Sequence, residues 1–396
     1  MARVKQTKIT TTEEWRYFYG DGKEHPDVNI EKLPEPPPWR TFRNIETMDK
    51  KEQQEIEARW TTIQALADSP ENERGKKKGA NFRIYTATKK DGTEEPTEEW
   101  KDVVNGVNAA LYLRRPLLVT GNPGTGKTSL AYAIAHELKL GPVLTWSITA
   151  RSTLQDGLYR YDAIARLQDS QLKKEENQEK NIGNYIQLGS VGTAFLPSRF
   201  PRVLLIDEID KSDINLPNDL LHLFEEGMFE IPELIRQEDL DDKEERTTDN
   251  VVEEPAKTEN HTPHNPVKVR TQDKGIKASI YEGRVQCTGF PIVIMTSNGE
   301  REFPPAFLRR CLRVKMPNPQ EEALKNIVKA HFGEDSFKKA SPEINKLVAE
   351  FLEEGDRATD QLLNVIYLLA NHVSSEAKDR DDIKALLLKS LSTTDE

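Results

Sequence analysis

The sequence predicts an α/β fold in which a parallel sheet is flanked by helices and followed by a helical lid. Short apolar runs at 117–120, 203–206 and 292–295 alternate with helical segments, which is typical of the buried strands of a parallel sheet. The last part of the chain, 319–396, has helical periodicity only. We expect lid helices there at about 319–331, 342–354, 357–373 and 381–391.

Residues 1–80 form an N-terminal accessory segment. Residues 33–40 are rich in proline and end in Trp-Arg, so we expect an extended strap lying on its own domain rather than an SH3-type ligand. Residues 44–67 predict a charged helix. Residues 71–90 carry seven basic and two acidic side chains. Such a segment is either a solvated linker or a patch that contacts phosphates.

The α/β core occupies 81–318. A helix at 100–111 leads into the first strand, and a second strand is expected at 142–148. Alternating apolar and basic residues at 312–316 predict a further strand at an edge of the sheet. The core is therefore a sheet whose strands are joined by helices.

Composition narrows the class of protein. The 396 residues carry a net charge of −11, which argues against nucleic acid as the main partner. No apolar run approaches the roughly 20 residues of a membrane span, and the start of the chain lacks a secretory apolar stretch. Because Cys287 and Cys311 alone make neither a metal site nor a disulfide framework, we expect packing roles for both and a cytoplasmic setting. Ten acidic against three basic residues at 237–260 predict a mobile surface loop.

A phosphate-binding motif, G-x-x-x-x-G-K-[ST], lies between the strand 117–120 and a helix at 129–138. Its glycines allow backbone N–H groups to surround phosphates, and the helix start adds a positive dipole end. Lys127 is expected to reach the β- and γ-phosphates, and the Thr128 hydroxyl to bind Mg²⁺. The motif predicts binding of a nucleoside triphosphate, without separating ATP from GTP. The predicted binding residues are Gly121, Asn122, Pro123, Gly124, Thr125, Gly126, Lys127, Thr128 and Ser129.

Two carboxylates end the apolar run 203–206. Asp207 and Glu208 would lie at the carboxyl end of a strand, which faces the ligand crevice in such sheets. We expect Asp207 to hold Mg²⁺ together with Thr128. Glu208 would polarise the water that attacks the γ-phosphate.

The acidic motif and its surroundings resemble the AAA+ superfamily, and within it the MoxR-type ATPases. The residues that carry the resemblance are 207–213 and 220–230, supported by 296–301 and 304–311. It covers roughly 97–375 and says little about the N-terminal 80 residues.

The resemblance assigns roles to four more residues. Asn298 resembles the sensor that contacts the attacking water or the γ-phosphate, against the alternative of an asparagine that only turns the chain. Arg310, and secondly Arg309, would reach the γ-phosphate bound to a neighbouring subunit. A surface salt bridge is the alternative for either arginine. Arg357 resembles the second sensor at the start of a lid helix, with an ion pair as its alternative.

The resemblance also implies two insertions and an activity. The insertions are expected at about 149–200 and 232–290, each with a hairpin. The implied activity is ATP hydrolysis with Mg²⁺ in a hexameric ring that remodels or activates a protein partner in a chaperone-like way. That partner would often carry a von Willebrand A domain.

Three other functions are also consistent with the phosphate-binding motif. A GTP-driven motor similar to McrB-type GTPases would act in a nucleic-acid restriction complex, although the net negative charge of the chain argues against it. A nucleotide-dependent scaffold would bind without much hydrolysis, although all the catalytic residue types are present. A small-molecule kinase would leave Asp207, Glu208, Asn298 and the arginine pair unexplained.

Overall fold

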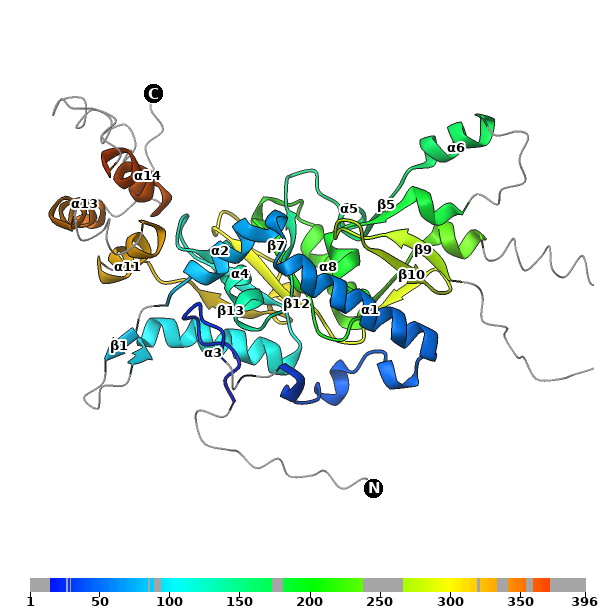
Figure 1. Ribbon diagram of the computed structural model, residues 1–396, viewed down its shortest axis with the longest axis horizontal. Helices are drawn as coiled ribbons and strands as arrows, with labels where there is room; N and C mark the ends of the chain where they lie inside the picture. Colours follow the sequence, from blue (N-terminus) through cyan, green and yellow to red (C-terminus); the bar gives the residue numbers. More distant parts are fainter. Residues whose placement is uncertain are drawn as a thin grey trace, which may run out of the picture.

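A five-stranded parallel sheet lies at the centre of the computed structural model, in the order β13-β3-β12-β7-β4 (Figure 1). This confirms the predicted fold class. The structure describes residues 15–25, 28, 30–84, 86–88, 94–172, 181–237, 266–318, 321–332, 341–353 and 359–370. The five strands are β3 (Leu117–Thr120), β4 (Leu144–Ser147), β7 (Val203–Asp207), β12 (Ile292–Ser297) and β13 (Leu312–Lys315).

Strand β12 lies between β3 and β7, and its register brings three strand ends together. Ser297 pairs with Thr120 of β3, and Met295 pairs with Ile206 of β7. The segments that follow these three strands therefore leave the same edge of the sheet. Strand β13 is at the edge, as the alternation of apolar and basic residues predicts.

Apolar side chains cover both faces of the sheet, as alternating strand residues require. Leu118 and Ile206 join the core on one face, with α7 (Ser190–Ala194) and α8 (Leu216–Glu226). Leu117, Val119 and Leu205 join the core on the other face. The second core also includes residues of α3 (Glu98–Leu113) and α4 (Lys127–Glu137).

Residues 73–81 form a helix, so the linker interpretation of this segment is wrong. Helix α2 (Glu73–Asn81) packs along α4, and Gly79 permits the close approach. A Cβ atom at Gly79 would lie 2.5 Å from the carbonyl oxygen of Tyr132 in α4. Glycine has a low helix propensity, so its packing role is not visible in local sequence. The predicted helix 44–67 begins later, as α1 (Lys50–Ala67), after the turn η3 (Ile45–Thr47).

The start of the described chain is tied to the core by Glu137, at the end of α4. This side chain is buried, and its carboxylate accepts three backbone hydrogen bonds from one loop. Asn108 of α3 holds the preceding backbone, accepting the N–H of Tyr17 at 2.7 Å. The donors to Glu137 are the N–H groups of Tyr19, Gly20 and Gly22, at 3.0, 3.1 and 2.9 Å.

The proline-rich stretch lies against the core through Arg40. Its guanidinium donates to the carbonyl oxygens of Arg114 and Phe224, the latter at 2.6 Å, and lies 4.5 Å from the ring centre of Phe290. Trp39 beside it is 79% exposed. The stretch contains the short turn η2 (Pro38–Arg40).

Two segments far apart in the sequence build a second sheet, in the order β10-β9-β6-β5. It contains a hairpin from each of the two segments where the sequence predicts insertions, joined by the parallel pair β6 and β9. In Figure 1 this sheet and the lid helices lie at opposite ends of the molecule. Its strands are β5 (Tyr159–Tyr161), β6 (Ile186–Leu188), β9 (Val267–Arg270) and β10 (Lys277–Ile280).

Three helices at the C-terminal side share a small core of their own, with Leu324, Val348 and Leu362 buried in it. They match three of the four expected lid helices. The expected helix 381–391, Arg357 and the acidic run after Gln237 lie outside the described residues. No described helix is both long and apolar enough to cross a membrane. The three are α11 (Glu321–Phe332), α13 (Ser341–Glu353) and α14 (Thr359–Ala370).

Shorter elements complete the described part. Two small antiparallel pairs join β1 to β2 and β8 to β11. Their bounds, with those of the short helices and turns, are β1 (Thr86–Thr88), β2 (Glu94–Pro96), β8 (Met228–Glu230), β11 (Arg284–Gln286), α5 (Leu154–Leu158), α6 (Ala163–Leu172), α10 (Pro305–Leu308), η1 (Ile30–Lys32), η4 (Pro70–Asn72), η5 (Ile182–Tyr185) and η6 (Ile209–Lys211).

Candidate nucleotide-binding site

The predicted phosphate loop joins β3 to α4. Gly124 and Gly126 have φ values of 76° and 86°, which glycine adopts without strain. Lys127 is buried, and its ammonium donates to the carbonyl oxygens of Gly121 and Asn122, each at 2.8 Å. Burial lowers the pKa of Lys127, while nearby carboxylates oppose this shift. The carbonyl oxygens of the loop thus hold the Lys127 ammonium in place.

Thr128 and Asp207 lie side by side, as the sequence predicts for two metal ligands. The Thr128 hydroxyl donates to Asp207 Oδ1 at 3.0 Å. Asp207 ends β7, while Thr128 stands in the first turn of α4, so the strand and the helix bring them together. Hydroxyl and carboxylate oxygens are the donor types that Mg²⁺ prefers.

Glu208 follows Asp207 in a strained backbone conformation. Its φ of 61° lies in the left-handed region, which non-glycine residues adopt only uncommonly. Its carboxylate pairs with the Lys211 ammonium at 2.8 Å, and both side chains are partly exposed. Its backbone N–H donates to Thr296 Oγ1 at 2.9 Å. The turn therefore directs Glu208 away from the regular path of β7.

Thr296, which the sequence analysis did not single out, connects the two acids. It is buried, and its hydroxyl donates to Asp207 Oδ1 at 2.6 Å while accepting the Glu208 N–H. The only sequence signal was its position at the end of an apolar strand. Its role depends on β12 lying beside β7, which local sequence does not reveal.

Asn298 lies just beyond β12 and lines the same cavity as the phosphate loop and the two acids. Its backbone N–H donates to Asp210 Oδ2 at 2.8 Å. The structure thus brings the predicted sensor, the loop and the acids together. Asp210 is a further residue that the sequence analysis quoted but gave no role.

The cavity at this edge has a volume of about 550 Å³, within the range of small-molecule sites. Part of its lining is apolar and comes from outside the predicted motifs: Phe82 follows α2, Trp100 lies in α3, and Ile327 and Leu363 lie in lid helices. The basic residues Lys78, from α2, and Arg83 also line it. The basic segment therefore reaches the phosphate-loop cavity.

The two candidate finger arginines lie elsewhere on the chain. Arg310 forms an ion pair with Glu225 and lines a separate hollow of about 500 Å³ with Trp39 and Arg115. Arg309 is exposed. For Arg310 the structure shows the surface salt bridge that the sequence left as an alternative. Within one chain, neither arginine belongs to the phosphate-loop cavity.

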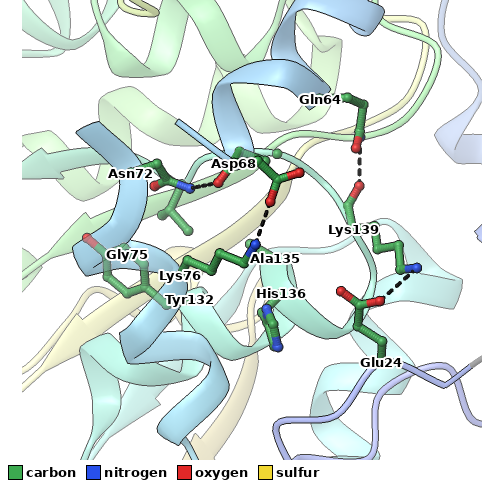
Figure 2. A pocket seen from close by; sticks show the side chains of 13 residues that line it. Glu24, Gln64, Asp68, Asn72, Gly75, Lys76, Tyr132, Ala135, His136 and Lys139 are labelled. Atoms are coloured by element: carbon green, nitrogen blue, oxygen red, sulfur yellow. Dashed lines mark hydrogen bonds and ion pairs between the residues drawn. The ribbon is translucent and has the colours of Figure 1, made fainter. Parts of the chain in front are cut away.

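A further cavity, of about 420 Å³, lies behind α4, between α1, α2 and the segment around Glu24 (Figure 2). Its lysines are already paired, Lys76 with Asp68 at 2.5 Å and Lys139 with Glu24 at 2.8 Å. None of the phosphate-loop residues before α4 lines it. The cavity at the sheet edge is therefore the candidate nucleotide site.

A parallel sheet with a phosphate loop after β3 and paired acids after β7 defines a P-loop nucleotide-binding fold. Residues 116–311 match the family described as "AAA domain (dynein-related subfamily)". That segment holds the loop, both acids, Asn298 and the arginine pair, and the match supports placing the core in the AAA+ ATPase superfamily.

Two other comparisons add little. Domain III of the replication initiation protein DnaA from Thermotoga maritima is similar at 16% identity, over 74% of this chain and 94% of that chain. The TM-score of 0.34 is too low to argue from. No curated protein matches the chain.

Proposed function

We propose that this chain is a MoxR-type AAA+ ATPase, which hydrolyses Mg²⁺-ATP in an oligomeric ring and thereby remodels or activates a protein partner. One observation supports hydrolysis above all. Thr128, Asp207, Thr296 and Glu208 are linked in one hydrogen-bonded cluster beside the phosphate loop. Glu208 lines the cavity beside this cluster, where its carboxylate could polarise a water.

In this proposal the loop residues bind the phosphates and the apolar lining takes the base. The backbone of residues 121–126 and the start of α4 supply N–H groups, and Lys127 supplies the positive charge. Phe82 and Ile327 are suited to contact the flat faces of a base. ATP is the proposed nucleotide because the implied family uses it.

Thr128 and Asp207 would hold Mg²⁺ through their adjacent oxygens. When bound, the ion neutralises charge on the phosphates. Glu208 would orient and deprotonate the attacking water, and Asn298 would contact that water or the γ-phosphate. Arg357, outside the described residues, would act as the second sensor.

Arg310 would complete the site of a neighbouring subunit, with Arg309 as the second choice. In one chain Arg310 pairs with Glu225 at the surface, so a trans role requires exchange of that partner in the ring. A hexamer is the proposed assembly. The sheet of β5, β6, β9 and β10 is the proposed surface for a protein partner, and a protein with a von Willebrand A domain is the proposed class of partner.

The decisive experiment measures ATPase rate per chain against protein concentration, for the native protein, Arg310→Ala and Glu208→Gln. The rate is expected to rise with concentration. Each variant alone should lose activity, by about 10³-fold for an arginine finger, and mixing the two should restore part of it. Arg313→Ala, an exposed arginine on β13, is the matched control and should keep full activity.

Three outcomes would contradict parts of the proposal. A rate that is flat with concentration and insensitive to Arg310→Ala would exclude a shared site for that residue, after which Arg309→Ala tests the second choice. A clear preference for GTP would favour the McrB-like alternative. Binding of Mg²⁺-ATP without turnover at any concentration would favour a scaffold.

A further inference from the structure

Asp210 is a buried carboxylate that the proposed hydrolysis does not use. It lies in the turn η6, two residues after Glu208, and is 3% exposed. A buried carboxylate is costly unless its hydrogen bonds offset the lost hydration. Among the described residues, Asp210 Oδ1 has no hydrogen-bond partner. The side chain is thus held in place by the other oxygen.

That other oxygen binds the loop of the proposed sensor. Asp210 Oδ2 accepts the backbone N–H of Asn298 at 2.8 Å and that of Glu300 at 3.1 Å. Between them, Gly299 has a φ of 81°, and its N–H donates to Ser297 Oγ. The N–H groups of Asn298 and Glu300 therefore converge on one carboxylate oxygen, which ties the loop to the turn that carries Asp210.

We propose that Asp210 is a positioning residue, which fixes the Asn298 loop to the turn that carries Glu208 so that the two move as one unit. This inference rests on the proposed function. The two segments are 88 residues apart in sequence, and both line the nucleotide cavity. Asn298 reaches the γ-phosphate region only if its backbone is held, and a misplacement near 1 Å can cost about 10²-fold in rate.

The test compares Asp210→Ala, Asp210→Asn and Asp213→Ala by ATPase kinetics and by Mg²⁺-ADP binding. Asp210→Ala removes the acceptor, so kcat should fall by about 10²-fold while ADP affinity stays within about threefold. Asp210→Asn keeps one oxygen that can accept both N–H groups and should recover most of the rate. Asp213, exposed in the same segment, is the control and should leave both values unchanged.

A double variant separates positioning from a general loss of stability. If Asp210 acts through Asn298, the pair Asp210→Ala and Asn298→Ala should be no slower than the slower single variant. Losses that multiply would overturn the inference, as would native kcat in Asp210→Ala. If Asp210→Ala does not fold, Asp210→Ser replaces it, because its shorter hydroxyl does not reach both N–H groups.

Failure of the proposed function gives a different result. If the native protein shows no turnover at any concentration, hydrolysis is refuted and the positioning role is tested by affinity alone. The ratio of ATP to ADP affinity in Asp210→Ala should then equal that of Asn298→Ala and differ from that of the native protein. A native ratio equal to both variants would refute the positioning role as well.

Discussion

The hydroxyl of Thr296 makes two hydrogen bonds, one to each of the two acidic residues that end β7 and begin the next turn. It donates to Asp207 Oδ1 and accepts the N–H of Glu208, so one oxygen fixes both the proposed metal ligand and the proposed base. A hydroxyl can do both because it is donor and acceptor at once. At this scale the chemistry depends on the position of single atoms.

Replacing Thr296 by valine keeps the side-chain shape and removes both bonds. We expect kcat for ATP to fall by about tenfold or more, because Glu208 and Asp207 lose their common anchor. Loss of the part-buried hydrogen bond from the Glu208 N–H should also lower stability by about 1 kcal/mol. Steady-state kinetics and thermal unfolding measure the two effects.

Thr296→Ser is the matched control, because it retains the hydroxyl and loses only a methyl group. It should keep most of the rate. Equal kinetics for the valine variant and the native protein would show that the strain at Glu208 is maintained by other contacts.

Local sequence predicted the residues whose chemistry is local. The phosphate loop is one continuous segment, and its glycines and lysine have roles that follow from their spacing. Asp207 and Glu208 could be predicted in the same way, because they directly follow an apolar run in the sequence. Thr296 and Asp210 act through partners 88 to 90 residues away, so their roles depend on strand order and not on spacing.

At the scale of elements, the end of α4 holds the loop at residues 19–22 near the described start of the chain. Glu137 closes α4 and binds three N–H groups of the loop at residues 19–22. Burial raises the pKa of this carboxyl, and the three N–H groups oppose that shift. The same loop also contacts the segment beside the nucleotide cavity. The carbonyl oxygen of Gly20 accepts the N–H of Ile84, two residues after Phe82, which lines that cavity.

Replacing Glu137 by alanine should free this loop. Three backbone donors lose their acceptor, so amide hydrogen exchange at Tyr19, Gly20 and Gly22 is expected to accelerate by at least about tenfold, with a loss of about 1–3 kcal/mol in stability. Asp102→Ala, at an exposed position on α3, is the control and should leave exchange at its native rate. Native exchange in Glu137→Ala would mean that Asn108 alone secures the segment.

Helix α2 shows where propensity misleads at this scale. Its sequence holds Gly75, Gly79 and three consecutive lysines, which favour a solvated chain. The helix forms because Gly79 admits the backbone of α4, and Lys78 lies 4.9 Å from the centre of the Tyr132 ring. Packing against α4 therefore stabilises α2 as a helix. Local sequence does not show which helix will pack against it.

At the scale of the whole molecule, both thiols lie in one core. Cys287 and Cys311 are buried in the cluster that covers one face of the central sheet. Burial raises the pKa of each to about 12, so almost no thiolate forms at neutral pH. Packing is the role that their small number in the sequence predicts.

Labelling with a thiol reagent at pH 8 should therefore be slow in the native protein and complete in denaturant. Both thiols are expected to react with one rate, since a shared core opens cooperatively. Cys287→Ser and Cys311→Ser assign the rate of each. Rapid labelling of one thiol would reveal a local opening on that side of the sheet.

The strands of the central sheet could be predicted, because each is a short apolar run with buried partners. The pairing of β6 with β9 could not, since it joins two separate insertions and leaves no periodic signal. The same limit applies to the cavity wall, which takes Phe82 and Leu363 from opposite ends of the chain. Long-range assembly is the part that the sequence alone did not reveal.

The core on the α3 and α4 face has a consequence for how this protein can be divided. Tyr17, Phe18, Trp60 and Ile63 lie in that core, yet all precede the segment shared with AAA domains, which begins at residue 116. A chain trimmed to the shared segment would expose the apolar surface these residues cover. The segment that matches the family model is therefore smaller than the unit that buries this core, and we expect the trimmed chain to aggregate.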